Sequence, residues 1–457
     1  MDPARWAAFE LQRVVAEQDA YANLVWPGIL ARNRLAGRDA AFATELGYGA
    51  LRWQGRHDAV LAACVDRGLE SLDPAVLDVL RLGVHQLHEM RVGDHAAVGQ
   101  SVDLARRAAG SGAAGLVNAV LRRVARGGGA SDWIAELVAA GAVPDAAADP
   151  AGHLAVAASH PRWIVAALHD ALASSVPGRT WEDTRALALA DNAPAGITLV
   201  ARTMSRDALL DRVAQQGIRA QPGAWSPRAV RVSAVSPAAI PEVATGAAGV
   251  QDEGSQLVAL ALAGAELDGR DERWLDMCAG PGGKAALLAD EVAGRGGVLT
   301  AVEPHAHRAD LVRAALRPVR GRHEVVVADA LDAPLQSGFD RVLVDAPCTG
   351  LGALRRRPES RWRRSAGDLA ALTALQRRLL ARAIELTRPG GVVLYATCSP
   401  HLAETDAVLG AVRNGHVEAL TATGGIPDSA LTVEGHLRTW PHLHDTDGMF
   451  AALIRRS

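Results

Sequence analysis

Apolar residues in roughly the first 130 positions recur at the spacing of amphipathic helices. The pair Asp73-Pro74 marks a helix start, since an aspartate cap is followed by proline at the first helical position. A second apolar stripe has arginines largely on its other side. The sequence therefore predicts an all-α domain at 1–140. The two stripes are Val76, Leu77, Leu80, Val84 and Leu87, and Leu116, Val117, Val120, Leu121 and Val124.

The pattern is mixed between about residues 153 and 245. Short apolar runs predict strands at 197–201, 218–220 and 229–232, and a helical pattern occupies 206–213. Strands and helices that alternate over such short lengths are typical of a small α+β module. We place this module at 145–245.

From about residue 250 onward, strand-like apolar runs alternate with helical stretches. Alternation of this kind is the signature of βαβ units, in which a largely parallel sheet is covered on both faces. It predicts an α/β Rossmann-like domain at 246–457. The predicted strands are 274–277, 298–302, 324–327, 341–344 and 392–396.

Composition excludes several classes of protein. In 457 residues, 49% are hydrophobic and 22% charged, which argues against disorder and fibrous repeats. No uncharged apolar run reaches membrane-spanning length, and the charged N-terminal stretch lacks the apolar segment of a secretory signal, so we expect a cytosolic protein. Four cysteines without metal-knuckle spacing predict free thiols and no metal. We expect a monomer.

The residues that follow the predicted strands carry the chemistry, because ligands of open parallel sheets bind at the carboxyl ends of the strands. A glycine-containing turn follows the first strand, Glu303 follows the second and Asp329 the third. The turn allows close approach of a ligand to the backbone, and an acid about 20 residues later can accept hydrogen bonds from a ribose. Together they predict a pocket for an adenosine-containing cofactor. The turn comprises Cys278, Ala279, Gly280, Pro281, Gly282, Gly283 and Lys284.

Lys284 is the one lysine among 48 Lys and Arg residues. A lysine that persists in so arginine-rich a chain is expected where a compact ammonium cannot be exchanged for a planar guanidinium. Chance survival is the alternative.

Two cysteines follow the fourth and fifth predicted strands. Asp345 and Cys348 lie at one strand end, and Cys398 lies at the next. Thiolates at such positions can act as nucleophiles when helix N-termini or cations lower their pKa. Cys64, by contrast, stands in an apolar helical run and is expected to be a small buried hydrophobe.

An arginine-rich stretch follows Gly350. It contains one acid, Glu359, so its charge is strongly positive although the whole chain carries −3. Arginines interleaved with an aromatic residue favour phosphate contacts and base stacking, whereas the alternative is an ordinary solvated face. We therefore predict nucleic-acid binding through Arg355, Arg356, Arg357, Arg361, Trp362, Arg363 and Arg364.

These motifs together resemble the RNA cytosine-5 methyltransferases of the Nol/Nop/Sun family. Within that family, the whole chain is similar to the bacterial enzymes that act on small-subunit (16S) rRNA. The N-terminal part resembles the helical RNA-binding domain of the antiterminator NusB, at 38–42, 52–53 and 116–123. The other segments that carry the resemblance are 250–256, 278–284, 345–348, 397–399 and 447–450.

The resemblance implies a fold, a cofactor and roles for residues. It implies a class I methyltransferase domain that uses S-adenosylmethionine, held by the turn 278–284, Glu303, Arg308, Asp329 and Asp345. Cys398 would attack C6 of cytosine, Cys348 would assist release of the methylated base, and Asp345 would stabilise the ring. Departures from the family are Glu303 where Asp is commoner, Gly280 for Ala and Met449 for an aromatic residue. Residues 403–406 stand where the family commonly has a Glu-Asn-Glu cluster.

Other functions remain as alternatives. Another RNA, such as tRNA, would suit the same site. A DNA cytosine-5 methyltransferase would use Cys348 as the attacking thiol, but Cys398 and the NusB-like region favour RNA. A non-catalytic RNA-binding factor would not need both thiols and Lys284. A dehydrogenase is disfavoured because the first turn lacks the G-x-G-x-x-G spacing.

Overall fold

The computed structural model describes residues 2–175, 177–233, 236–420 and 426–457. The chain divides into two compact units. The first, here called the helical unit, comprises Met1–His169, Thr180–Ala193 and Leu354–Arg364. The second, called the sheet unit, comprises Asp170–Arg179, Pro194–Ala353 and Ser365–Ser457.

The helical unit is built around a core from the two predicted stripes. Asp73 caps α5 by accepting a hydrogen bond from the backbone N–H of Ala75, as the sequence predicted. Leu116 is wrong as a core residue, because 40% of it is exposed; the rest of its stripe is buried. The helices are α1 (Pro3–Glu17), α2 (Ala22–Arg32), α3 (Gly37–Arg52), α4 (Gln54–Cys64), α5 (Pro74–His88), α6 (Asp94–Ala109), α7 (Ser111–Arg126), α8 (Ala130–Ala139), α9 (Pro150–Ala157), α11 (Trp181–Ala190) and α17 (Ser360–Arg363).

A small antiparallel sheet opens the main part of the sheet unit. Its strand order is β2-β3-β1-β4. Strands β1 (Ile197–Ala201) and β3 (Ala229–Val232) match the predicted bounds, and α12 (Arg206–Gln215) is the predicted helix. The remaining elements of this module are β2 (Ala220–Pro222), β4 (Ala248–Val250) and α13 (Pro241–Ala244), preceded in the chain by α10 (Arg162–Ser175).

The larger sheet has the order β10-β12-β9-β8-β5-β6-β7, with β11 paired to β12. Strands β5 to β9 run parallel, and β12 joins β9 antiparallel. All five predicted strands are present; β6 has the predicted bounds, and the other four have shifted ends. Their bounds are β5 (Arg273–Asp276), β6 (Val298–Val302), β7 (Arg322–Val326), β8 (Phe339–Asp345) and β9 (Thr387–Thr397), followed by β10 (Gly415–Glu418), β11 (Leu437–Arg438) and β12 (Phe450–Arg456).

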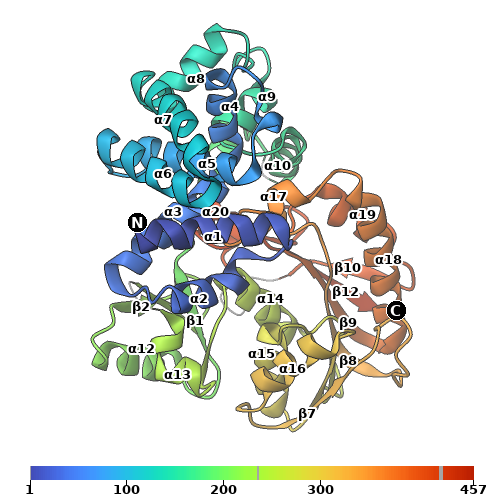
Figure 1. Cartoon of the computed structure of the whole chain (residues 1–457). Helices are drawn as coiled ribbons and strands as arrows, with labels where there is room; N and C mark the ends of the chain where they lie inside the picture. Colours follow the sequence, from blue (N-terminus) through green and yellow to red (C-terminus); the bar gives the residue numbers. More distant parts are fainter. Residues whose placement is uncertain (1, 176, 234–235, 421–425) are drawn as a thin grey trace. The chain divides into compact units, whose positions relative to one another are not determined.

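Helices cover both faces of this sheet, as the predicted fold class requires (Figure 1). Successive residues of β9 alternate between two cores: Leu394 packs with α14 and α15, and Tyr395 packs with α18. Alternation along a strand explains why both cores draw on the same strands. The covering helices are α14 (Glu253–Gly264), α15 (Gly283–Ala293) and α16 (Ala306–Leu316) on one face, and α18 (Asp368–Leu386) and α19 (Asp406–Leu409) on the other.

The compact units divide the chain differently from the sequence-based domains. Helix α9, placed by sequence in the middle module, belongs to the helical unit. The segment Leu354–Arg364 also belongs to that unit, although it lies between strands β8 and β9 of the large sheet. The helical unit is therefore discontinuous in sequence.

Candidate active site

The carboxyl ends of four neighbouring parallel strands gather the predicted site residues at one edge. Asp276 ends β5, Asp345 ends β8, Glu303 directly follows β6, and Cys398 directly follows β9. The register places Asp345 opposite Ala396 and Asp276 opposite Leu343, so the ends of β5 and β8 lie within two residues of each other. We call this the thiol edge. The topological expectation for ligand sites in open α/β sheets is met here.

The glycine turn connects β5 to α15. Gly282 has a φ of 108°, in the left-handed region, and a Cβ there would lie 2.7 Å from the Cβ of Ala315 on α16. A side chain at 282 would force the two helices apart. The turn is thereby held close to the sheet, where Cys278 donates its backbone N–H to Asp276 at 3.2 Å.

Glu303 is buried and braced against the turn. Its carboxylate accepts the backbone N–H of His305 at 3.0 Å and lies 3.4 Å from Arg308 Nη1. Arg308 also donates to the carbonyl of Gly280 at 2.8 Å. A Cβ at position 280 would overlap Glu303 Oε2. The glycine and the longer acid, two departures from the family pattern, therefore meet in space.

Asp329 lies on the loop after β7 and is exposed. Its Oδ1 accepts the backbone N–H of Leu331 at 3.0 Å, the geometry of a turn-stabilising aspartate. It follows the third predicted strand, as expected. Its Oδ2 takes no part in the hydrogen bond to Leu331.

Lys284 and Asp345 form an ion pair at 2.9 Å. Burial would lower the pKa of Lys284, but the charge and hydrogen bond of Asp345 outweigh it, and Cys398 and Asp276 add to the net rise. Lys284 therefore lies beside the carboxylate of Asp345 and interacts electrostatically with Cys398, and its raised pKa keeps it positively charged.

The two thiols of this edge meet. Cys348 Sγ and Cys398 Sγ lie 3.4 Å apart, and none of the four cysteines is in a disulfide. The pKa of Cys348 is raised well above its usual range, first by its hydrogen bond with Cys398 and then by burial. Burial likewise raises the pKa of Cys278, and that of Cys64 to about 11. Cys64 is buried in the helical core, as predicted.

Two residues of this region had been missed as site candidates. Burial, together with the neighbouring Asp345, raises the pKa of Asp276 to about 7, and its Oδ2 is buried without a hydrogen-bond partner among the described residues. Glu404 is fully buried and accepts hydrogen bonds from Thr349, the residue after Cys348. An acid at a strand end was the available signal for Asp276; nothing in the spacing of Glu404 indicated its partner.

The arginine-rich segment is not part of the sheet unit. It belongs to the helical unit, where Arg361 is fully buried. Arg361 donates to the Asn192 side chain at 2.6 Å and to the carbonyls of Ser159 and Asp191 at 3.0 and 3.3 Å. Arg363 donates to the carbonyls of Val15 and Ala20.

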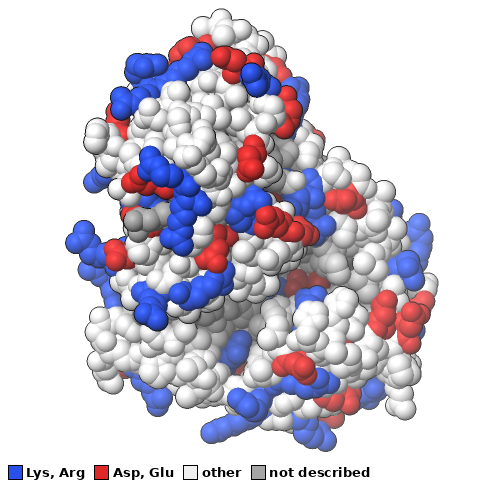
Figure 2. All heavy atoms as spheres, viewed as in Figure 1, with Lys and Arg blue, Asp and Glu red and all other residues white. Residues whose placement is uncertain are grey.

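The prediction of an RNA contact is therefore wrong for Arg361 and for the buried Arg355, because both guanidinium groups are enclosed by the protein. The ring of Trp362 lies against Gly55. Arg357 is exposed, and Arg356 and Arg364 are partly so. For these three the prediction stands. Over the helical unit, the face in Figure 2 shows arginines interspersed with acids.

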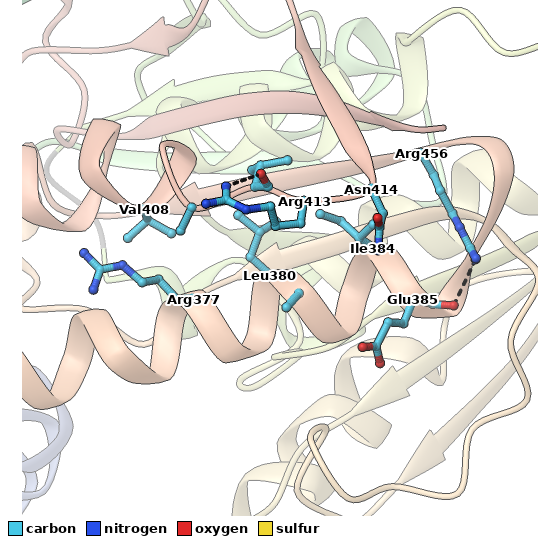
Figure 3. A pocket seen from close by; sticks show the side chains of 11 residues that line it. Arg377, Leu380, Ile384, Glu385, Val408, Arg413, Asn414 and Arg456 are labelled. Carbon is cyan, nitrogen blue, oxygen red and sulfur yellow. Dashed lines mark hydrogen bonds between the residues drawn. The ribbon is translucent and has the colours of Figure 1, made fainter.

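A separate pocket lies along α18 (Figure 3). Arg456, at its rim, is the last residue of β12 and donates to the carbonyl of Glu385, near the start of β9. This end of the sheet is opposite the thiol edge, and no predicted site residue lines the pocket. Within the described ranges, no group of three or more His, Cys, Asp or Glu side chains is placed to hold a metal, and no helix is long and apolar enough to cross a membrane.

Comparisons with known proteins identify the family. The model for the 16S rRNA methyltransferases RsmB/F matches residues 265–455, and that for the NusB family matches residues 2–126. A Mycobacterium tuberculosis (strain H37Rv) protein whose name calls it a methyltransferase is 51% identical, covering 100% of this chain and 97% of its own. The ribosomal RNA small subunit methyltransferase B of Pseudomonas putida is 34% identical over 97% of this chain and 94% of its own.

These matches define a methyltransferase. The chain belongs to the RsmB/F family of 16S rRNA methyltransferases, with a NusB-family region at its N-terminus. Among solved structures, that of PH0851 matches with a TM-score of 0.78 at 20% identity, covering 100% of this chain and 99% of that one. NSun6 from Pyrococcus horikoshii, solved with SFG, matches 65% of this chain and 98% of its own with a TM-score of 0.55 at 17% identity. Both show likeness of fold.

Proposed function

We propose that this enzyme methylates C5 of a cytosine in 16S rRNA, with S-adenosylmethionine as the methyl donor and Cys398 as a covalent nucleophile. The observation that supports this most directly is the 3.4 Å separation of Cys348 Sγ and Cys398 Sγ beside the Lys284–Asp345 pair. C5 of cytosine is a poor nucleophile until a thiolate adds at C6. Two adjacent thiols suit a reaction that must both form and resolve such an adduct.

Charges around the thiols favour Cys398 as the attacking group. Lys284 interacts electrostatically with Cys398, and a nearby cation stabilises a thiolate. Cys348 instead faces the carboxylate of Glu404, and its raised pKa keeps it protonated. The charges around the two cysteines therefore suit Cys398 as the attacking group and Cys348 as the thiol that stays protonated.

The residues at the thiol edge fit an adenosine-bearing cofactor. Among the described residues, Asp276 Oδ2 is a buried acceptor without a hydrogen-bond partner, and Gly280, which has no side chain, lies against the carboxylate of Glu303. Glu303 would hold the ribose, the turn 278–284 with Arg308 would surround the cofactor, and Asp329 would meet the adenine end. When bound, S-adenosylmethionine supplies an electrophilic methyl group on a sulfonium.

The chain's own groups would then act in order. Cys398 Sγ would form a bond to C6 of the cytosine, which would make C5 nucleophilic enough to accept the methyl group as its bond to the sulfonium sulfur breaks. Asp345, held by Lys284, hydrogen-bonds the ring and stabilises the charge that addition places on it. Loss of the C5 proton to a base and cleavage of the C6–S bond return the thiolate, and the Cys348 thiol assists this release.

Methyl transfer tests the proposal. The full chain is incubated with labelled S-adenosylmethionine and small-subunit rRNA, free or in particles, and protected cytosines are mapped by bisulfite treatment. We expect one protected cytosine. Methyl transfer to tRNA but not to rRNA would show that tRNA is the substrate. If the chain neither transfers methyl groups nor binds the cofactor, the result would favour a non-catalytic RNA-binding factor.

Thiol variants test the mechanism. Cys398→Ala should abolish turnover and covalent capture of RNA, a loss of at least roughly 10⁴-fold, as expected for a nucleophile. Cys348→Ala should still capture RNA but release it slowly. Cys64→Ala, which removes the buried thiol of the helical core, is the matched control and should keep activity. Capture by Cys398→Ala but not by Cys348→Ala would reverse the two roles, as in a DNA-type enzyme.

A further inference from the structure

Glu404 occupies an unusual position beside the Cys348 loop. It ends the short helical turn Leu402–Glu404 after β9 and is fully buried. Its Oε1 accepts the backbone N–H of Thr349 at 2.8 Å, and its Oε2 accepts the Thr349 hydroxyl at 2.5 Å. One carboxylate thus holds both donors of the residue that follows Cys348.

Gln376 completes the hold from the other side of the cysteine. This residue of α18 is fully buried, and its Nε2 donates to the carbonyl of Pro347 at 2.9 Å and to Glu404 Oε1 at 3.1 Å. Pro347 and Thr349 flank Cys348 in the chain. The Glu404–Gln376 pair therefore fixes the backbone on both sides of this thiol.

The same network reaches the segment of the second thiol. Thr349 Oγ1 lies 3.0 Å from Ser399 Oγ, and Ser399 directly follows Cys398. Glu404 is itself anchored, because its carbonyl accepts the Tyr395 hydroxyl at 2.7 Å and its backbone N–H donates to the His401 carbonyl at 2.9 Å. Hydrogen bonds therefore connect Glu404 to the segments of both Cys348 and Cys398.

A neutral side chain at position 404 could also accept the hydrogen bonds of this loop. The negative charge of Glu404 must therefore serve a further purpose. The Glu404 carboxylate accepts hydrogen bonds from Thr349 and Gln376, and all of these donor groups are neutral. Burying a carboxylate without a cation partner is costly. Its charge acts on Cys348, where it adds to the effects of Cys398 and burial that hold the thiol protonated.

We propose that Glu404, supported by Gln376, is a positioning residue that fixes Cys348 against Cys398 for release of the methylated base. This inference rests on the proposed function, in which Cys348 serves the release step. Loss of Glu404 should therefore leave attack by Cys398 intact and slow the cleavage of the C6–S bond.

The test measures RNA joined to protein after denaturation, alongside methyl transfer, with the full chain and rRNA. Glu404→Ala should accumulate adduct and release it roughly 10- to 100-fold more slowly, since small misplacements at a reacting centre cost that much. Glu404→Gln, which keeps an acceptor for Thr349, should restore part of the release rate. In the double variant with Cys348→Ala, the adduct should rise no further than with Cys348→Ala alone.

Controls separate this role from a loss of structure. Glu385→Ala removes an exposed acid from α18, the helix of Gln376, and should leave release unchanged. If Glu404→Ala fails to fold, Gln376→Ala is measured in its place and should give the same adduct.

Slow turnover without adduct in Glu404→Ala, while Cys348→Ala accumulates it, would overturn this inference alone. Absence of adduct in Cys348→Ala would overturn the proposed release role, and this inference with it.

Discussion

Two buried aspartates, one in each compact unit, share a raised pKa but have different neighbours. Burial raises the pKa of Asp191 in the helical unit and of Asp276 at the thiol edge to about 7. Arg361 opposes the rise at Asp191, whereas the charge of Asp345 adds to the rise at Asp276. The strongest charge effect on Asp191 is therefore that of a cation, whereas the strongest charge effect on Asp276 is that of a second carboxylate. Crowded like charges cost stability and mark a site arranged for chemistry.

Arg361→Met should give the largest change in stability. It removes hydrogen bonds to Asn192, Ser159 and Asp191, and it removes the larger of the two arginine charges that oppose the raised pKa of Asp191. Breaking such a buried arrangement costs about 3–5 kcal/mol. Denaturant unfolding followed by circular dichroism measures it. Arg357→Met, which removes an exposed charge from the same segment, should change stability by no more than about 0.5 kcal/mol. Equal effects would show that burial in this segment does not matter.

Asp276→Asn should change how stability depends on pH. The folded pKa of about 7 exceeds the ordinary 3.8, so the contribution of this group is complete below pH 3.8 and is lost as pH rises through 7. Relative to the wild type, the variant should gain a few kcal/mol between pH 4 and 8. Unfolding at several pH values tests this. Asp310→Asn, which alters an exposed acid, should show no such trend.

Gly280→Ala should weaken binding of S-adenosylmethionine by about tenfold, since overpacking costs on the order of 1–3 kcal/mol. The added methyl would meet the carboxylate of Glu303, which must move. Glu303→Asp is one methylene shorter, and in the double variant affinity should partly return. Isothermal titration of all three variants measures the coupling. Strictly additive losses would show that the two positions do not compensate each other.

Arg357→Ala should give the smallest effect. If this exposed arginine contacts an rRNA phosphate, its loss should weaken binding a few-fold and reduce the dependence of log affinity on log salt concentration by about one unit. RNA binding at several salt concentrations measures this slope. An unchanged slope would remove the last fully exposed arginine of the segment from the RNA surface.

Much of the fold followed from periodicity. Strands β1, β3 and β6 have the predicted bounds, because their apolar runs are short, continuous and bounded by turns. The grouping of Glu303, Asp345 and Cys398 also followed, since parallel strands present their carboxyl ends at one edge. These predictions needed only local pattern and one topological rule.

What escaped prediction depends on partners far away in the chain. A run of arginines is locally the same whether it faces water or a buried pocket, and the partners of Arg361 lie about 170 to 200 positions earlier. The hold of Glu404 on Thr349 spans 55 positions. Leu116 was misplaced because an apolar residue at the border of a stripe need not be buried.

The discontinuity of the helical unit has a consequence for synthesis. Residues up to Ala193 leave the ribosome long before Leu354–Arg364, yet Asn192, Asp191 and Ser159 receive their hydrogen bonds from Arg361. Until residue 361 emerges, these acceptors lack the guanidinium that donates to them in the complete chain. The N-terminal helices therefore reach their final stability only after the glycine turn, Glu303 and Cys348 have all been translated, and a fragment that ends at residue 193 should be less stable than the same helices in the complete chain.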